Sequence, residues 1–229
     1  MLIQLLRSEP LEPRLENGKR LHYNFKFVEL RKSKFMKMEK IMQDIFKRLI
    51  NEIFLLKFKP YGWKKQGSNF RYIDASGLGR VINFQKSKWN TADELEFFIN
   101  YGLYIEIDNQ LVNKSFKEYE CQFRARTGLD KGSFHLNSDT DFETLQRRVE
   151  QALDEAINQF DKVGNKEHYI SMILSGELQK YTGTPIMNYY TCKLFSDMGY
   201  YEDIYDYVKE KGGPYFEMLT AEIESKTKH

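Results

Sequence analysis

The chain has 229 residues, 41% of them hydrophobic and 15% aromatic, and this composition excludes an intrinsically disordered protein. Its 35 basic and 33 acidic residues nearly cancel, so no overall field favours nucleic acid or an anionic membrane surface. We therefore expect a folded, soluble protein with no nucleic-acid partner and no membrane partner.

Residues 1–35 differ in composition from the rest of the chain. They hold eight basic and four acidic residues, a net charge of +4, whereas residues 36–229 carry −2. Two prolines and the Asn17-Gly18 pair interrupt any early helix, while aromatic and polar residues alternate from Tyr23 to Phe27 as in a strand. We expect an N-terminal extension that is loosely ordered or contributes one strand.

The next segment has the periodicity of an amphipathic helix. From Met38 to about Lys57, apolar residues recur three and four positions apart, and Pro60 and Gly62 then end the pattern. Such a helix needs an apolar surface to cover. The positions on its apolar stripe are Met38, Ile41, Met42, Ile45, Leu49, Ile53 and Leu56.

Four segments then have the alternation of β-strands. The clearest is the third, where apolar and polar residues alternate from Leu95 to Ile107. Links of hairpin length favour antiparallel pairing of successive strands, which is a meander. The predicted strands are Phe70–Ile73, Arg80–Trp89, Leu95–Ile107 and Cys121–Gly128.

A second amphipathic helix follows the predicted sheet. Thr140 and Glu143 fit a capping box, and an apolar stripe continues from Phe142 to Phe160 before Gly164. Shorter helices are expected around Tyr169–Leu178, from Thr184-Pro185, over Tyr201–Lys211 and from Pro214.

These elements predict an α+β fold. An antiparallel meander of about four strands is packed on one face by two helices and followed by a C-terminal helical segment. The expected division is an N-terminal extension over residues 1–35, an α+β domain over residues 36–164 and a helical segment over residues 165–229.

A polar face of this sheet is the candidate ligand site. If the strands pair in sequence order, six side chains share that face, and guanidinium and amide groups there can bind a carboxylate, a phosphate or a peptide edge. The simpler interpretation is an ordinary solvated face, because antiparallel sheets commonly expose one face to water and two of the asparagines can pair across strands. The six candidates are Asn83, Gln85, Asn100, Tyr104, Arg124 and Arg126.

A second candidate surface lies at the end of the Arg80–Trp89 strand. Lys86, Lys88 and Trp89 combine two cations with an indole, a combination that can anchor a protein partner. A tryptophan at the end of a sheet also often covers the rim of the core.

Catalytic and metal-binding motifs are not evident. His135 and His168 have no partner at ligand spacing, and Cys121 and Cys192 form neither a metal nor a redox pair. We assign no catalytic residue, no metal and no cofactor. With no secretory signal or long apolar run, the expected compartment is the reducing cytoplasm.

Four motifs after the first helix suggest a family. Phe58–Phe70, Val81–Ser87, Phe98–Gly102 and Arg124–Arg126 resemble the bacterial domain-of-unknown-function 4304 (DUF4304) family, over about residues 38–160. This resemblance implies an α+β domain of bacterial origin and implies no activity.

Two functional hypotheses follow. The first is a non-catalytic binding or protein-interaction module that uses the polar sheet face, with a partner such as a toxin or another cytoplasmic protein. The alternative is an enzyme that acts on a small anionic substrate held by Arg124 and Arg126, with Tyr104 as acid or base. An enzyme requires a concave pocket with converging polar groups, which a flat sheet face does not provide.

Overall fold

The computed structural model describes residues 20–105, 115–127 and 132–227, and the side chains of residues 20–32, 34 and 35 are outside the description. Residues 1–19 of the N-terminal extension predicted over residues 1–35 therefore lie outside the described residues. The same holds for parts of two other predictions, the end of the Leu95–Ile107 strand and most of the connection that follows it.

The centre of the molecule is one antiparallel sheet of six strands. Consecutive strands pair from β1 to β5, and β6 pairs with the first half of β4, on the same edge as β5. The predicted α+β meander is confirmed, with two strands more than expected. The strands are β1 Lys64–Gln66, β2 Asn69–Ile73, β3 Gly79–Lys86, β4 Glu94–Tyr104, β5 Phe123–Thr127 and β6 Ser133–Asn137.

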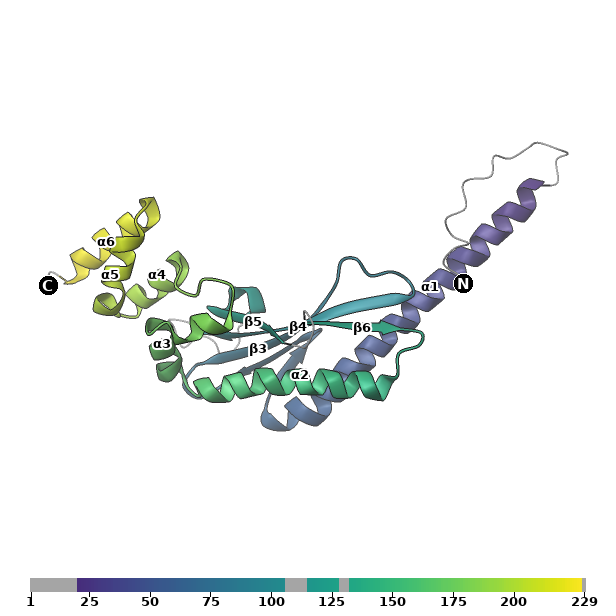
Figure 1. The fold of residues 1–229 in the computed structure, drawn as a ribbon, viewed down its shortest axis with the longest axis horizontal. Coiled ribbons are helices and arrows are strands. Elements are labelled where there is room, and N and C mark those ends of the chain that lie inside the picture. The colour runs from purple at the N-terminus through teal and green to yellow at the C-terminus, as the bar shows by residue number, and fades with distance from the viewer. Residues whose placement is uncertain (1–19, 106–114, 128–131, 228–229) are drawn as a thin grey trace.

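Two long helices, α1 (Arg20–Ile53) and α2 (Phe142–Val163), cover one face of this sheet (Figure 1). The β4 residues on that face are buried, because their aromatic and aliphatic side chains pack against both helices. The Phe46 ring of α1 lies edge-on to Phe97, with 5.0 Å between ring centroids, and Phe160 of α2 lies 5.7 Å from Tyr101.

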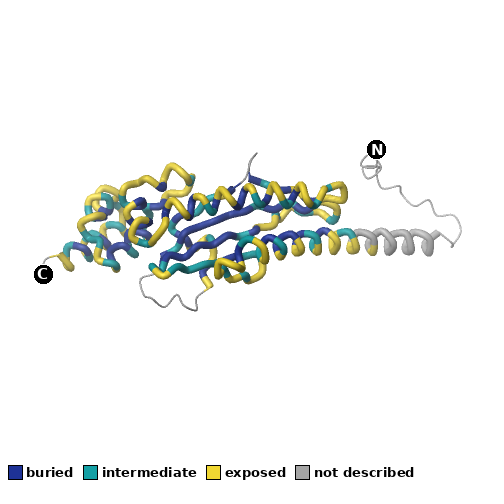
Figure 2. Tube along the Cα trace, turned by 90° about the horizontal axis from the view of Figure 1, so that it is seen from below, coloured by how far each residue is buried: buried dark blue, intermediate teal, exposed yellow. Residues whose placement is uncertain are grey.

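Helix α1 is longer than the periodicity predicted. The strand interpretation of Tyr23–Phe27 is wrong, because helix α1 runs through these residues from Arg20. From Arg20 to Ile53 the sequence has no glycine or proline to break a helix, so the well-packed C-terminal half extends towards the N-terminus. Ser33 and most of residues 36–41 are exposed where α1 runs beyond the sheet (Figure 2).

The end of this helix also corrects one predicted core residue. Residues Phe54–Phe58 form a π-helical turn, which widens the helix and changes which side chains face the sheet. As a result Leu56 is 67% exposed, while Phe58 is buried against Phe70.

Helix α2 begins with a different cap from the one predicted. Asp141, rather than Thr140, is the N-cap, and its carboxylate accepts a hydrogen bond from the Thr144 amide at 2.7 Å. Thr140 instead completes the preceding turn, where its hydroxyl accepts from the Asn137 amide and donates to the Asn137 side chain.

The C-terminal segment consists of short helices, and α4, α5 and α6 gather at one end of the molecule (Figure 1). The helix predicted from Thr184 starts later, because Asn188 is its N-cap. None of the described helices combines the length and apolar composition needed to span a bilayer. The helical elements are α3 Lys166–Leu174, the 3₁₀ helix η7 Glu177–Tyr181, α4 Tyr189–Asp197, α5 Tyr201–Lys211 and α6 Pro214–Thr227.

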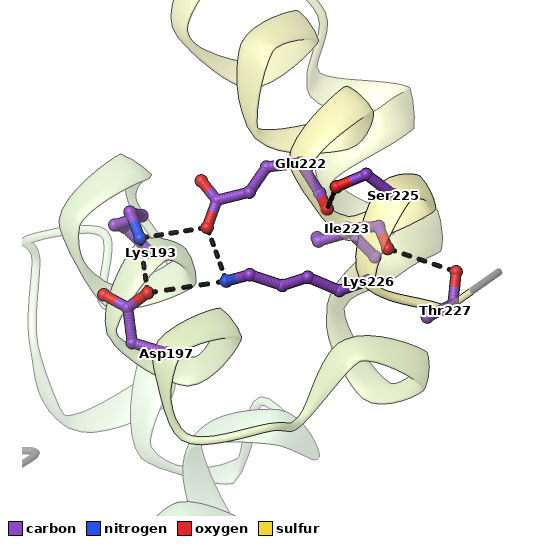
Figure 3. Close-up of polar contacts among 7 residues, drawn as sticks. All are labelled: Lys193, Asp197, Glu222, Ile223, Ser225, Lys226 and Thr227. Carbon is purple, nitrogen blue, oxygen red and sulfur yellow. Dashed lines mark hydrogen bonds and ion pairs between the residues drawn. The ribbon is translucent and has the colours of Figure 1, made fainter. Parts of the chain in front are cut away.

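Four charged side chains join α4 to α6 (Figure 3). Within α4, Lys193 pairs with Asp197, and within α6, Lys226 Nζ lies 2.6 Å from Glu222 Oε1. Two further ion pairs join the helices: Lys193 Nζ lies 3.1 Å from Glu222 Oε1, and Lys226 pairs with Asp197. Because all four side chains are about one third exposed, this network contributes modestly to stability.

A buried ion pair fixes the turn before β3. Arg80 is 9% exposed, and its Nη1 donates to Asp74 Oδ2 at 2.7 Å while its Nη2 donates to the Gly164 carbonyl. The Asp74 carboxylate also accepts hydrogen bonds from Ser76 and from the Leu78 amide. This turn thereby connects the sheet to the end of α2.

Candidate functional site

The strand register brings the predicted polar residues onto one sheet face. Asn83 of β3 pairs with Asn100 of β4, and Asn100 pairs with Arg126 of β5. Arg124 lies two residues before Arg126, and Gln85 two residues after Asn83, so both point to the same side as their neighbours. The prediction that these residues share a face is confirmed. That face is opposite α1 and α2.

A chain of hydrogen bonds crosses three strands on this face. Arg126 Nε donates to Asn100 Oδ1 at 2.9 Å, and Asn100 Nδ2 donates to Gln85 Oε1 at 2.7 Å. The Arg126 guanidinium carbon also lies 4.1 Å from the centroid of the Phe98 ring. These contacts fix the orientation of Arg126 before any ligand arrives.

Asn83 belongs to a separate pair. Its Nδ2 donates to Asn69 Oδ1 of β2 at 2.9 Å. The direct Asn83 to Asn100 pairing considered from the sequence is not formed, because Asn100 uses its amide for Gln85 and Arg126.

A pocket of about 430 Å³ opens beside this face, along β5. One wall comes from the sheet and the other from the end of η7 and the segment that follows it, so the polar face borders a solvent-open pocket. Both predicted arginines line the pocket, with Gln85 and Asn100 beside them. The lining residues are Gln85, Asn100, Glu118, Arg124, Ala125, Arg126, Tyr181, Thr182, Gly183 and Thr184.

The second wall is held in place by Gln179. Its Nε2 lies 3.2 Å from the carbonyl oxygens of both Thr182 and Thr184, and its Oε1 accepts from the Ile186 amide at 3.0 Å. The Thr184 amide also donates to the Thr182 hydroxyl at 3.1 Å. This wall is thus a fixed loop of main-chain and hydroxyl groups that can take part in hydrogen bonds.

Glu118 is a pocket residue that the sequence interpretation missed. It lies in η5 (Glu118–Glu120), a 3₁₀ turn in the connection before β5. Burial raises the pKa of its carboxyl group, and the positive charges of Arg124 and Arg126 offset part of this rise. The pocket therefore contains two guanidinium groups and one carboxyl group that burial disfavours in its charged form.

Tyr104 shares the sheet face but does not line the pocket. Its ring stacks on Phe116 with centroids 4.9 Å apart and planes 9° from parallel, beside a small buried cluster that contains Val81, Phe116 and Cys121. Gly102 permits this covering segment to approach, because a Cβ there would lie 2.8 Å from the Cys121 side chain. The role of Tyr104 as a substrate acid or base thus loses its geometric basis.

The three residues of the second predicted surface make different contacts. Lys86 points to the helix side, where its Nζ donates to Gln43 Oε1 of α1 at 2.8 Å. Lys88 and Trp89 lie past the end of β3, with the lysine Nζ 5.0 Å from the indole ring, and Trp89 is 78% exposed. The indole does not cover the rim of the core.

The histidines make local contacts. His135 Nδ1 lies 2.9 Å from Glu94 Oε1, and His168 Nδ1 lies 3.1 Å from the Val163 carbonyl. In the part of the chain that the structure describes, no three His, Cys, Asp or Glu side chains are grouped to hold a metal ion.

Comparison with protein families agrees with the motifs in the sequence. A model described as a domain of unknown function (DUF4304) matches residues 56–182, more than half of the chain. The chain belongs to this family. No curated protein matches, and no solved structure matches.

The family model matches residues 56–182, whereas the motifs in the sequence indicated about residues 38–160. It begins in the π-helical turn after α1 and continues through η7 to Thr182. The DUF4304 region therefore contains both walls of the pocket up to Thr182, together with all six strands. Its description gives no activity.

Proposed function

We propose that this DUF4304 protein is a non-catalytic binding module whose pocket beside β5 takes a negatively charged group of a protein partner. Arg124 and Arg126 supply the positive charge, while Gln85 and Asn100 hold Arg126 in place. The observation that carries the proposal is the meeting of both arginines with a fixed polar loop around one pocket of about 430 Å³.

Chemical complementarity favours an anion. A guanidinium group presents several N–H donors in one plane, which suits carboxylate or phosphate oxygens. Among the residues that the structure describes, one carboxyl group, that of Glu118, lines the pocket together with the two arginines. Burial raises the pKa of this carboxyl group, so its charged form is less favoured than that of an exposed glutamate.

The proposed compartment is the bacterial cytoplasm. Cys121 and Cys192 are both free and buried, a state that suits a reducing compartment. The bacterial origin is proposed from the resemblance to the DUF4304 family.

An enzyme acting on a small anionic substrate is the second candidate. Glu118 favours it, since a carboxyl group with a raised pKa beside two arginines is suited to proton transfer. In this alternative Glu118, rather than Tyr104, is the acid or base. The binding module stays the first proposal because the pocket is open to solvent along β5, whereas proton-transfer sites generally restrict water.

The test is calorimetric titration of the full chain with inorganic sulfate and with glutarate, at constant ionic strength adjusted with chloride. We expect both anions to bind the unaltered protein, and the double variant Arg124→Ala, Arg126→Ala to bind about tenfold or more weakly. The matched control is Arg147→Ala, Arg148→Ala, which removes the same charge from the exposed side of α2. Equal binding by all three proteins, or no binding by any, would reject the pocket as an anion site.

A further inference from the structure

We propose that the partner is an extended acidic peptide segment of another protein, and that this segment adds as a new antiparallel strand to the edge of β5 that points away from β4. The inference rests on the proposed function, because the same two arginines bind the acidic side chains of the peptide. It adds that the main chain of β5 takes part in recognition.

The Tyr169 hydroxyl establishes the direction of the β5 main chain. It accepts a hydrogen bond from the Phe123 amide at 2.9 Å and donates to the Leu103 carbonyl of β4 at 3.0 Å. Phe123 and Leu103 are partners in the strand register, so their main-chain groups face each other across the ladder.

Antiparallel geometry then orients the rest of the strand. Main-chain N–H and C=O groups of successive residues point alternately towards and away from the neighbouring strand. The main-chain groups of Ala125 and Thr127 therefore point towards β4, as those of Phe123 do. The N–H and C=O groups of Arg124 and Arg126 therefore point away from β4, towards the edge. Among the described residues, no main-chain hydrogen bond from another segment reaches either arginine.

The pocket provides the space that an added strand needs. Arg124, Ala125 and Arg126 form one side of it and residues 181–184 form the other. An extended peptide in this space pairs with β5 and contacts the fixed loop on its far side. Strand addition to a sheet edge is a general mode of peptide recognition, with affinity from the main chain and specificity from alternate side chains.

The spacing of the arginines specifies the peptide. Arg124 and Arg126 lie two residues apart on the same face, so acidic residues at positions i and i+2 of the added strand stand opposite them. In an antiparallel added strand these are also the peptide residues whose N–H and C=O groups face β5. Recognition of charge and pairing of the main chain thus involve the same two peptide residues.

The same spacing of the two arginines disfavours a second copy of this chain as the strand that pairs with β5. If two β5 edges paired antiparallel around Ala125, Arg124 of each copy would lie opposite Arg126 of the other. Like charges directly opposite each other on neighbouring strands are destabilising. An acidic partner removes this repulsion, so the occupant is a different chain.

The experiment measures amide hydrogen exchange by nuclear magnetic resonance in the full-length protein. The probe is a short acetylated and amidated peptide in which glutamate alternates with threonine. In the free protein we expect slow exchange at Ala125 and Thr127 and fast exchange at Arg124 and Arg126. Saturating peptide is expected to slow the two arginine amides by about tenfold or more.

Two methylated peptides provide the matched comparison. N-methylation at the glutamates removes the N–H groups that face β5, whereas N-methylation at the threonines leaves them in place. We expect the first modification to abolish protection of the Arg124 and Arg126 amides and the second to preserve it.

Strand addition is overturned if the glutamate-methylated peptide protects both amides as well as the unmodified one. It is also overturned if sulfate and peptide bind in a manner that depends on both arginines while the two amides stay unprotected. In either case the anion site of the proposed function stands. If sulfate, glutarate and peptide all fail to bind, the proposed function fails as well.

Discussion

The two faces of the sheet are built from alternating residues of the same strands, yet they differ in what they contact. The face under α1 and α2 is dry and aromatic, with Phe84 and Phe97 at most 2% exposed. The opposite face is covered around Tyr104 and Phe116 and polar towards β5, where the pocket opens. The pleat of one sheet therefore separates the buried face that packs against the helices from the face for which we propose binding.

The largest difference in stability is expected between alanine variants of two neighbouring residues of β4. Phe97 is fully buried against Phe46 and Phe134, whereas Phe98 lies on the opposite face beneath Arg126. Phe97→Ala should lower the free energy of unfolding by about 3–5 kcal/mol through loss of burial and a residual cavity. Phe98→Ala should cost about 1 kcal/mol. Urea denaturation of both variants measures the difference, and equal losses would refute the assignment of the two faces.

The buried ion pair on the helix side should give the next largest effect. Burial raises the pKa of Asp74, but hydrogen bonds from Ser76, Arg80 and Leu78 and the charge of Arg80 outweigh this, so the pKa is lowered overall. Asp74→Asn should cost about 1.5–3 kcal/mol at neutral pH, because a charge-assisted bond to a buried guanidinium is lost.

The pH dependence of this effect has a definite sign. A carboxyl group whose pKa is lowered by folding stabilises the native state above its unfolded pKa of about 3.9, and this contribution is lost as the pH falls through the folded value. The stability difference between the unaltered protein and Asp74→Asn should therefore shrink below about pH 4. A difference that stays constant down to acid pH would contradict the role of the carboxylate.

A larger side chain under the segment that covers Gly102 should destabilise the protein. A Cβ at Gly102 would lie 2.8 Å from the Cys121 side chain and 2.9 Å from the Phe123 carbonyl oxygen. Gly102→Ala should therefore cost about 1–3 kcal/mol by overpacking. Gly183→Ala is the control, since nothing lies within 4 Å of its added Cβ, and its cost should be within about 0.5 kcal/mol. Thermal unfolding distinguishes the two, and a harmless Gly102→Ala would show that the covering segment packs loosely.

The smallest effect on stability, and a clear one on binding, is expected at Glu118. Burial raises the pKa of the Glu118 carboxyl group, so this group is protonated at a higher pH than an exposed glutamate. Once it is protonated, its negative charge no longer competes with a bound anion for Arg124 and Arg126. Sulfate, whose own charge is constant above mildly acidic pH, should bind the unaltered protein more tightly as the pH decreases through the Glu118 pKa.

Glu118→Gln provides the comparison. The variant should bind sulfate about twofold to fivefold more tightly at neutral pH, with a flatter pH profile. Titration calorimetry at several pH values measures this, and identical profiles for the two proteins would remove Glu118 from the electrostatics of the pocket.

Much of the fold was predictable because its strongest signals are local. The alternation along β4 separates Phe97 and Ile99 from Phe98 and Asn100, and this alone orients one face to the helices. Sequence order then sufficed to place Asn83, Asn100 and Arg126 side by side.

What escaped prediction depends on contacts between distant segments. β6 is short and follows a stretch of sequence, residues 128–132, without a clear hairpin signal, and Glu118 lies in a connection without periodicity. The loop around Gly183 becomes a pocket wall only through Gln179, whose hydrogen bonds cannot be inferred from spacing. The π-helical turn at Phe54–Phe58, which changes the side chains that face the sheet, likewise depends on packing against the sheet.

The most direct test of the central claim follows the side-chain Nε–H resonances of four arginines during a titration with glutarate. Arg124 and Arg126 line the pocket, while Arg147 and Arg148 lie exposed on α2 and report on nonspecific binding. The account predicts saturable shifts at Arg124 and Arg126 and none at Arg147 and Arg148. Equal shifts at all four arginines, or shifts at none of them, would contradict it.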